Sequence, residues 1–340
     1  MADAYNALLG RLIAGEDLSR EQANGLFNRI MDGELTEAQV AGVLVALAAK
    51  GETVEEITGA AQAMRAHAVK IDTGGRDVID TCGTGGTGLN TFNISTAAAF
   101  VAAGAGAVVA KHGNRTNTRP SGSADVLAAL GVNLDADMET VTRCLAEAHV
   151  CFCFAIKHHP AMKYAAAVRK QLAVRTIFNV LGPLTNPAGA DRQLMGVFDG
   201  AWVERIAGTL AALGARRAMV VHAECGLDEL STTCPTLIAE AIDGKVTTRT
   251  VTPADFGLPA ADLSAFAVAS PAESAQRILA VLAGAKGPDR DIVLLNAAAA
   301  LAVAGKADTI ADALPLAAES IDSGAAKGAL EKLVEVSNAG

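Results

Sequence analysis

The fold class follows from residues 77–111, DVIDTCGTGGTGLNTFNISTAAAFVAAGAGAVVAK. This stretch opens with the short apolar run VIDTC, passes through a glycine-rich loop, continues as the alanine-rich segment STAAAFVAAGAG and closes with the apolar run AVVAK. Short apolar runs bounded by glycine indicate buried strands, and the segment between them indicates a helix. Because strands joined through a helix lie parallel, this stretch predicts the start of a parallel sheet.

Further strands follow along the chain. The runs CFCFA at 151–155, LMGVF at 194–198 and AMVVHA at 218–223 are separated by helical or loop segments. LIAEAIDGKVTTRTV is typical of a hairpin that turns at Asp243-Gly244, which makes the sheet mixed. The remaining C-terminal part is helical in pattern. The sequence therefore predicts an α/β domain with a mixed, mainly parallel sheet flanked by helices.

The segment before the sheet has a different pattern. Residues 5–67 place Leu, Ile, Val and Ala at three-to-four spacing, with joints at Asp32-Gly33 and Lys50-Gly51. This spacing predicts a small N-terminal helical domain. The helical domain is expected to comprise residues 1–72, with a helical contribution from about 164–190. The larger α/β domain is expected to comprise residues 73–163 and 191–340.

Composition narrows the class of protein. The chain has 340 residues, of which 51% are hydrophobic and 4% aromatic, and a formal net charge of -9. An acidic chain is a poor binder of phosphate backbones, so we expect no nucleic-acid partner. No apolar run reaches the roughly 20 residues that span a bilayer. The first residues lack a signal-peptide pattern, so we expect no membrane partner and a cytoplasmic protein.

The cysteines and histidines do not indicate zinc. Six cysteines are scattered along the chain, and the closest pair, Cys151 and Cys153, has one residue between its members rather than two. The six histidines form no pair at the usual ligand spacing. We expect the cysteines to be buried thiols.

The sharpest motif is the run Gly83-Thr84-Gly85-Gly86-Thr87-Gly88 directly after a strand. Asn93, Ser95 and Thr96 follow at the start of a helix. Glycines let backbone N–H groups turn toward an anion, and a helix start adds further donors. The element indicates a phosphate cradle, with a plain tight turn as the alternative. The spacing fits neither a nucleotide P-loop nor a dinucleotide motif.

A second polar loop follows the next strand, in Lys111-His112-Gly113-Asn114-Arg115. Ser121-Gly122-Ser123 comes shortly after. Such groups at the carboxyl end of a parallel strand lie where ligands of these sheets bind. The loop is interpreted as an anion site, with a solvated surface turn as the alternative.

Two further features carry charge. Arg169 and Arg175 project from a predicted helix, ahead of a turn that opens at Gly182-Pro183, and arginine binds carboxylates with paired hydrogen bonds. Asp228 and Glu229 follow the strand AMVVHA, where adjacent carboxylates suit magnesium. Solvated arginines and a helix-capping acidic pair are the alternatives.

Together these elements resemble the anthranilate phosphoribosyltransferases of tryptophan biosynthesis. The resemblance rests on GTGG, NxST, KHGNR, SGSAD, HPAMK, VRTIFNxLGPLTNP and GLDE in this order, and on the C-terminal segment that begins LLNAAAALAVAG. It implies a nucleoside phosphorylase or class-IV phosphoribosyltransferase architecture and a homodimer formed through the helical domain. The implied reaction joins the phosphoribosyl group of phosphoribosyl pyrophosphate to the amine of anthranilate, with Mg²⁺ as cofactor and pyrophosphate as product.

The resemblance also implies site residues. Those for phosphoribosyl pyrophosphate are Gly83, Thr84, Gly85, Gly86, Thr87, Thr91, Asn93, Ser95, Thr96, Lys111 and Ser123. Those for anthranilate are Gly83, His112, Asn114, Arg169 and Gly182. Those for the metal are Ser95, Asp228 and Glu229. No residue is assigned as acid, base or nucleophile.

Several positions depart from the family pattern. Thr87 stands where Asp is frequent, and Ile156 stands where Pro is usual. The remaining departures are Arg119 and Pro120 in the second loop, and Ala167 and Ala173, where Pro and Gly are expected.

Two other functions remain open from the sequence. A pyrimidine nucleoside phosphorylase shares the architecture, but Asn114-Arg115 favours the transferase. A non-catalytic nucleic-acid-binding relative would lose the carboxylate pair, and Asp228-Glu229 with the -9 charge argues against it.

Overall fold

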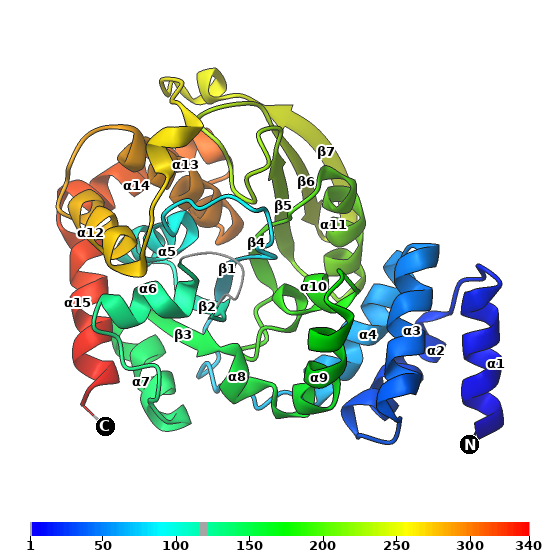
Figure 1. The fold of residues 1–340 in the computed structure, drawn as a ribbon. Coiled ribbons are helices and arrows are strands. Elements are labelled where there is room, and N and C mark those ends of the chain that lie inside the picture. The colour runs from blue at the N-terminus through cyan, green and yellow to red at the C-terminus, as the bar shows by residue number, and fades with distance from the viewer. Residues whose placement is uncertain (1, 116–120, 340) are drawn as a thin grey trace.

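The computed structural model describes residues 2–115 and 121–339, and its N-terminal helices form a group of their own beside the sheet (Figure 1). Three of the four N-terminal helices begin with a capping box at Ser19, Thr36 or Thr53. In each, the cap side chain accepts the backbone N–H of the Gln or Glu three residues later, whose side chain accepts the backbone N–H of the cap residue. The four helices are α1 Ala2–Ile13, α2 Arg20–Met31, α3 Glu37–Lys50 and α4 Val54–Ala66.

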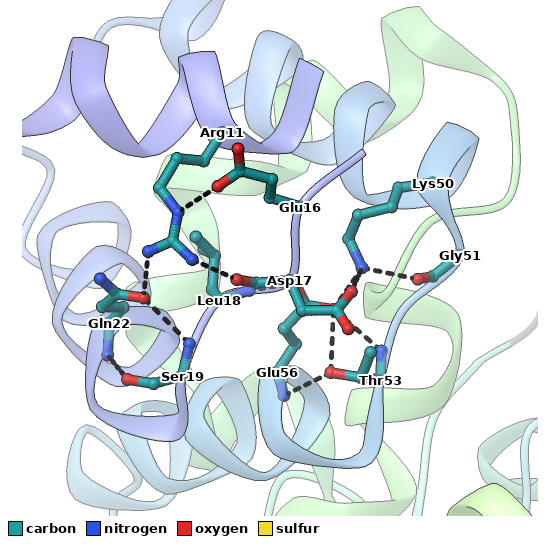
Figure 2. A network of polar contacts seen from close by, with 10 residues as sticks. All are labelled: Arg11, Glu16, Asp17, Leu18, Ser19, Gln22, Lys50, Gly51, Thr53 and Glu56. Atoms are coloured by element: carbon teal, nitrogen blue, oxygen red, sulfur yellow. Dashed lines mark hydrogen bonds and ion pairs between the residues drawn. The ribbon is translucent and has the colours of Figure 1, made fainter. Parts of the chain in front are cut away.

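A buried carboxylate ties these helices together (Figure 2). Glu56 has no exposed surface, and its oxygens accept hydrogen bonds from the backbone of Leu18 at 2.9 Å and of Thr53 at 2.9 Å. Lys50 Nζ lies 3.0 Å from Glu56 and also reaches Asp17 at 2.7 Å. A paired and hydrogen-bonded carboxylate is tolerated in a core, whereas an isolated one is not. The network therefore fixes how the segments between these helices meet.

The sheet has seven strands in the order β3-β2-β1-β4-β5-β6-β7. The first five strands of this order pair in parallel, and β6 and β7 are added antiparallel. The prediction of a mixed, mainly parallel sheet is confirmed. The strands are β1 Ile79–Gly83, β2 Val109–Gly113, β3 Val150–Phe154, β4 Arg192–Gly196, β5 Arg217–Ala223, β6 Thr236–Ile242 and β7 Lys245–Val251.

The predicted hairpin turns at Asp243-Gly244. Both residues have positive φ, 47° and 80°. Two successive positive φ angles define the tight turn that matches the twist of paired strands. Its position confirms the hairpin and sets the register of β6 against β7.

Each face of the sheet is covered by helices, as alternate residues of β5 demonstrate. Met219 and Val221 pack into the core beneath α5 and α13, whereas Ala218 and Val220 pack into the core shared with α11 and the N-terminal helices. Because both faces are buried there, the central strands are largely apolar, whereas the edge strand β7 is polar and mostly exposed. The flanking α-helices are α5 Ile94–Gly104, α6 Ser123–Ala129, α7 Met138–Ala148, α8 Ala155–His158, α9 Lys163–Leu172, α10 Phe178–Leu181, α11 Val203–Ala212, α12 Pro271–Leu282, α13 Pro288–Val303, α14 Ile310–Asp322 and α15 Ala325–Ser337. Short 3-10 turns lie at Pro160–Met162, Pro183–Thr185, Gly200–Trp202, Pro253–Phe256 and Leu263–Phe266.

Small side chains let the central helices approach closely. From Ile292 to Val303 helix α13 is buried all round, and it packs against α5, whose Ala97 to Ala99 are also buried. A helix that is apolar on every side belongs in the centre of a domain. The alanine-rich composition thus supplies the core without many aromatics. None of the helices in the described ranges is long and apolar enough to cross a membrane.

Helices α9 and α10 join the N-terminal group rather than the sheet. Helix α9 contacts α2 and α3, and α10 contacts α4. Val168 and Phe178 are buried in the same core as Phe27, and the rings of Phe27 and Phe178 meet edge to face at 5.8 Å. The segment around 164–190 therefore links the helical bundle to the ends of the strands.

Candidate active site

The candidate residues gather at the carboxyl edge of the sheet. β1 lies between β2 and β4, and β5 follows β4, so the loops after Gly83, Gly113, Gly196 and Ala223 leave the sheet at the same edge. Open parallel sheets bind ligands at this edge. The glycine loop, the Lys111 loop and the Asp228 loop thus come from neighbouring strands.

The glycine loop is bent by positive φ angles and held at its base. Gly85, Gly86 and Gly88 have φ of 62°, 74° and 76°, which glycine adopts at little cost. Thr84 donates its backbone N–H to Gly196 at 2.9 Å, and its hydroxyl accepts from the Phe198 backbone at 3.0 Å. The predicted turn is therefore a shaped loop anchored on β4.

Asp228 reaches the glycine loop directly. Its Oδ2 accepts the backbone N–H of Gly85 at 3.0 Å, and the side chain is 7% exposed. A Cβ on Gly196 would overlap the Asp228 carbonyl, so only glycine at this end of β4 admits the close approach. The loops after β1 and β5 are consequently held as one unit.

Glu229 makes the matching contact with the start of α5. Its Oε1 accepts the backbone N–H of Ser95 at 3.2 Å. Lys111 is only 3% exposed, and its Nζ donates to Ser95 Oγ at 3.2 Å and to the Thr81 carbonyl. Burial lowers the pKa of Lys111, and nearby Asp80 opposes that effect. A carboxylate, a hydroxyl and an ammonium group are thus brought together.

Asn93 and the hydroxyls around it brace the helix start. Asn93 Oδ1 accepts from Ser121 Oγ and Ser274 Oγ, both at 2.7 Å. Ser123 Oγ donates to the Asn114 carbonyl at 3.3 Å, and Thr91 forms an isolated bridge with Ala267. These contacts connect the glycine loop to the start of α6.

Thr96 presents an unsatisfied hydroxyl in this region. Its Oγ1 is buried and has no hydrogen-bond partner in the described part of the chain. A buried hydroxyl without a partner costs free energy unless a ligand or water completes it. Thr96 lies on the first turn of α5, directly after Ser95.

Two buried histidines are neutral. Burial lowers the pKa of His112 to about 3 and that of His159 to about 4, and the neighbouring His158 acts in the same direction on both. Their ring centroids lie 5.2 Å apart, and neither Nε2 has a hydrogen-bond partner in the described ranges. The backbone of Gly182 faces the His112 ring. The structure thus brings His112 and Gly182 together.

Asp80 lies beneath these histidines at full burial. Its Oδ1 accepts the His112 backbone N–H at 3.0 Å, and burial raises its pKa to about 6. Asp80 was not predicted as a site residue, because an acidic residue inside an apolar run gives no sign of whether it points into the core.

Arg169 lies half-buried on α9. Its Cζ is 5.4 Å from the centre of the Phe178 ring, and burial lowers its pKa. Within residues 2–115 and 121–339 no acidic side chain pairs with it. Phe178 begins the short helix that ends just before Gly182. Asn114 is exposed, and its Oδ1 accepts the Arg115 backbone N–H at 2.8 Å. No contact recorded in the structure joins Arg169 to Asn114.

Arg175 is not on a helix, contrary to the expectation from the sequence. Helix α9 ends at Leu172, and Ala173 turns the chain with a φ of 52°. Arg175 then donates to the Gly86 carbonyl at 2.6 Å, with its Cζ 4.0 Å from the centre of the Phe198 ring. It clamps the glycine loop, a link that the motif spacing did not reveal.

The departures from the family pattern fall in different surroundings. Thr87 Oγ1 accepts the Leu89 backbone N–H at 3.2 Å, so the hydroxyl stabilises the turn. Ala173 adopts the left-handed conformation that glycine would adopt without strain. Ile156 is 64% exposed and Ala167 is exposed on α9. Arg119 and Pro120 lie outside the described residues.

Asp228 and Glu229 suit a hard cation. Among the described residues no group of three or more His, Cys, Asp or Glu side chains is arranged to hold a metal ion. Mg²⁺ needs no such cage, since it is usually held by one or two carboxylates together with substrate phosphates and waters. The pair next to a phosphate-type loop fits that donor set.

Comparison with known proteins agrees with this geometry. Residues 75–327 match the glycosyl transferase family, a/b domain, and residues 6–68 match its helical bundle domain. An anthranilate phosphoribosyltransferase of Anaeromyxobacter dehalogenans is 55% identical over 96% of each chain. One from Thioalkalivibrio sulfidiphilus is 52% identical over 98% of each chain.

Solved structures give the same result. The crystal structure of anthranilate phosphoribosyltransferase from Thermus thermophilus matches with a TM-score of 0.92 and 43% identity, covering 97% of this chain and 99% of that one. The Saccharomyces cerevisiae enzyme in complex with PRPP and Mg matches with a TM-score of 0.88 and 28% identity, covering 99% and 98%. By its sequence, both its domains and its fold, the chain belongs to the anthranilate phosphoribosyltransferase family.

Proposed function

We propose that this protein transfers the 5-phosphoribosyl group of phosphoribosyl pyrophosphate to the amine of anthranilate, forming N-(5-phosphoribosyl)anthranilate and pyrophosphate in tryptophan biosynthesis. The observation that carries the proposal is the joining of the glycine loop, the start of α5 and the Asp228-Glu229 pair at one sheet edge. Relatives at about half identity over nearly their whole length carry this name.

The donor substrate would lie over the glycine loop and the start of α5. The positive φ angles of the loop free backbone N–H groups for phosphate oxygens, and the N-terminal end of α5 adds a favourable dipole. Residues proposed to hold phosphoribosyl pyrophosphate are Gly83 to Thr87, Thr91, Asn93, Ser95, Thr96, Lys111 and Ser123. The buried Lys111 supports this site through Ser95, because its ammonium group already bonds that hydroxyl.

Magnesium would be held by Asp228, Glu229 and Ser95 together with the substrate. When bound, it would offset negative charge on the leaving pyrophosphate. The yeast relative with PRPP and Mg supports this use. In this chain Asp228 also fixes Gly85, so the same carboxylate shapes the loop.

Anthranilate would lie between Gly83, His112, Asn114, Arg169 and Gly182. The Arg169 guanidinium, which has no acidic partner among the described residues, can donate two parallel hydrogen bonds to the carboxylate. His112 stays neutral near pH 7, so its ring adds no charge beside the amine. The Saccharomyces cerevisiae enzyme in complex with 4-fluoroanthranilate supports an aromatic amine as the acceptor substrate.

The chain's contribution to the reaction is orientation and charge. Displacement at the ribosyl carbon passes through an oxocarbenium-like state, so backbone donors that stabilise the departing pyrophosphate lower the barrier. The aromatic amine is already neutral at pH 7. No side chain is therefore assigned as a general base.

One assay separates this function from the alternatives. Anthranilate fluorescence is followed with phosphoribosyl pyrophosphate and Mg²⁺, and uridine or thymidine with phosphate serves as the control for a pyrimidine nucleoside phosphorylase. A fluorescence decay that needs all three components supports the proposal. Turnover of the nucleoside pair alone, or nucleic-acid binding without turnover, would overturn it.

We also propose a homodimer through the helical domain. A groove of about 660 Å³ between α1 and α3 is lined largely by apolar side chains, including Ile13 and Val45, which are 73% and 45% exposed. Exposed apolar patches of this kind mark interfaces. Sedimentation of Val45→Glu should give monomers, with Leu279→Glu, an exposed site on α12, as the control that stays dimeric. A dimeric Val45→Glu would contradict this interface.

The division into residues 1–72 with about 164–190, and 73–163 with 191–340, is likewise a proposal. It is supported by the packing of α9 and α10 on the N-terminal helices. A cytoplasmic location and the lack of a nucleic-acid partner are proposed from the biosynthetic role and the -9 charge.

A further inference from the structure

Two cysteines face each other at the open end of the β5–β6 pair. β5 and β6 are antiparallel, with Ala223 opposite Thr236. The pairing continues past the strand ends, because the Glu224 backbone N–H donates to the Pro235 carbonyl at 2.9 Å. Cys225 and Cys234 lie just beyond, where the chain turns after β5 and before β6, and the Cys225 backbone N–H donates to Cys234 Sγ at 3.1 Å.

This closeness suits a disulfide. Cys234 Sγ lies 3.1 Å from the Cys225 backbone nitrogen, and the two thiol side chains contact each other. Bond formation therefore needs little backbone movement. The loop that the bond would close, residues 226–233, contains Asp228 and Glu229.

Exposure distinguishes this pair from the other thiols. Cys82, Cys144, Cys151 and Cys153 are buried, as the sequence analysis expected, whereas Cys225 and Cys234 are partly exposed and correct that expectation. Cys151 and Cys153 lie with their Sγ atoms 3.9 Å apart but inside β3, out of reach of solvent. Only a reagent-accessible pair can be oxidised without unfolding.

Hydroxyl groups surround the Cys225 thiol. Its Sγ lies 3.1 Å from Thr233 Oγ1 and 3.6 Å from Ser231 Oγ. Burial acts to raise its pKa, but hydrogen bonds from Cys234, Thr233 and Ser231 outweigh burial and lower it. For Cys234, burial and the contact with Cys225 raise the pKa. The surroundings thus favour Cys225 as the attacking sulfur.

We propose that Cys225 and Cys234 are an oxidisable dithiol that exchanges with low-molecular-weight disulfides to form a cross-strand bond. The Cys225 thiolate attacks one sulfur of the small disulfide, whose S–S bond breaks and releases one thiol. Cys234 then loses its proton and attacks Cys225 Sγ, releasing the second thiol. Two protein thiols are oxidised by two electrons, and the small disulfide is reduced to two thiols that carry both protons.

The bond would change the loop that carries the proposed metal ligands. It withdraws Cys225 Sγ from Thr233 and Ser231, and Ser231 stands two residues after Glu229. This expectation rests on the proposed function: the oxidised enzyme should need several-fold more Mg²⁺ for half-maximal activity. Dithiothreitol should restore the reduced curve.

The first experiment tests the bond without using activity. The full-length protein is incubated with excess glutathione disulfide, and its peptides are mapped by mass spectrometry. The expected result is a Cys225–Cys234 link with loss of two hydrogens, while Cys151 and Cys153 stay reduced. The Cys234→Ser variant should instead trap a glutathione adduct on Cys225. Absence of the link in the folded wild type, or a link through Cys151–Cys153, overturns the proposal.

The second experiment tests the consequence. Mg²⁺ titrations compare the reduced and oxidised wild type with Cys225→Ser/Cys234→Ser under the same treatment. A shift in the wild type alone supports the coupling, and superimposable wild-type curves overturn it. Should the reduced protein show no transferase activity, the proposed function fails, and the peptide map still decides the dithiol.

Discussion

The backbone N–H of Gly85 donates to Asp228 Oδ2 at 3.0 Å, although 143 residues separate them. The bond joins the phosphate-type loop after β1 to the acidic loop after β5. A parallel contact joins Ser95 to Glu229 at 3.2 Å. Each carboxylate therefore has two tasks, since it would hold magnesium and also fixes the backbone that faces the donor substrate.

The two tasks of Asp228 can be separated by substitution. Asp228→Asn keeps an acceptor for Gly85 but removes the charge, so we expect a folded protein with a largely lost response to Mg²⁺. Asp228→Ala/Glu229→Ala removes both, and each lost acceptor leaves an unpaired donor costing about 1–3 kcal/mol. Turnover measured against Mg²⁺ concentration reports the loss of metal binding, and urea unfolding reports the loss of stability. Wild-type activity of the double variant at the same Mg²⁺ concentration would place the metal elsewhere.

Gly196 controls the approach of the acidic loop. A Cβ at this position overlaps the Asp228 carbonyl, so Gly196→Ala must push the loop away at about 1–3 kcal/mol. We expect lower stability and a weaker Mg²⁺ response. Gly25→Ala in α2 is the matched control, because its Cβ meets nothing within 4 Å and alanine favours a helix. An unchanged Mg²⁺ titration in Gly196→Ala would show that this spacing does not matter.

Arg175 clamps the glycine loop from the side of the helical bundle. Removing its hydrogen bond to Gly86 should raise the KM for phosphoribosyl pyrophosphate roughly tenfold, since such bonds are worth about 1.5–3 kcal/mol. Arg205→Ala is the control, because Arg205 packs on Trp202 at 4.9 Å in a similar manner but has no recorded contact with the loop. Equal KM values in Arg175→Ala and Arg205→Ala would remove Arg175 from the site.

The buried histidines make the fold sensitive to acid. His112 and His159 have folded pKa values of about 3 and about 4, below the ordinary 6.5, so the unfolded chain binds protons first as pH falls. Stability should drop from about pH 6.5 toward pH 4, by up to about 1.4 kcal/mol per pH unit for each histidine. Asp80, with its pKa raised to about 6, acts in the opposite sense, because its contribution is lost as pH rises.

The histidine contribution can be measured by substitution. Urea unfolding of His159→Gln at pH 7 and pH 4.5 should give a smaller difference in free energy than the wild type gives. An equal difference would mean that other groups cause the acid sensitivity.

The sequence predicted the sheet and the loops at its edge, but not their contacts. Glycines and hydroxyl residues spaced after an apolar run indicate a phosphate loop from local sequence alone, without knowledge of what the loop contacts. The expected strand 194–198 is observed at Arg192–Gly196, because Arg192 and Gln193 pair with β1 although they are polar. Pairing partners, rather than hydropathy, set the strand's limits.

Contacts between distant segments could not be predicted from the sequence either, because they depend on how the chain turns and pairs in the fold. Arg175 contacts Gly86 only because Ala173 ends α9 with a left-handed turn. Cys225 meets Cys234 only because the chain turns beyond the paired ends of β5 and β6. A single sequence does not contain either distance.

The two KM values of Arg169→Ala test where the two substrates lie. We expect the KM for anthranilate to rise by about 10- to 100-fold, because a charge-assisted paired contact is worth about 1.5–3 kcal/mol, while the KM for phosphoribosyl pyrophosphate changes little. Lys170→Ala, the exposed neighbour on α9, should change neither. An unchanged KM for anthranilate together with a raised KM for phosphoribosyl pyrophosphate would contradict the placement of the two substrates.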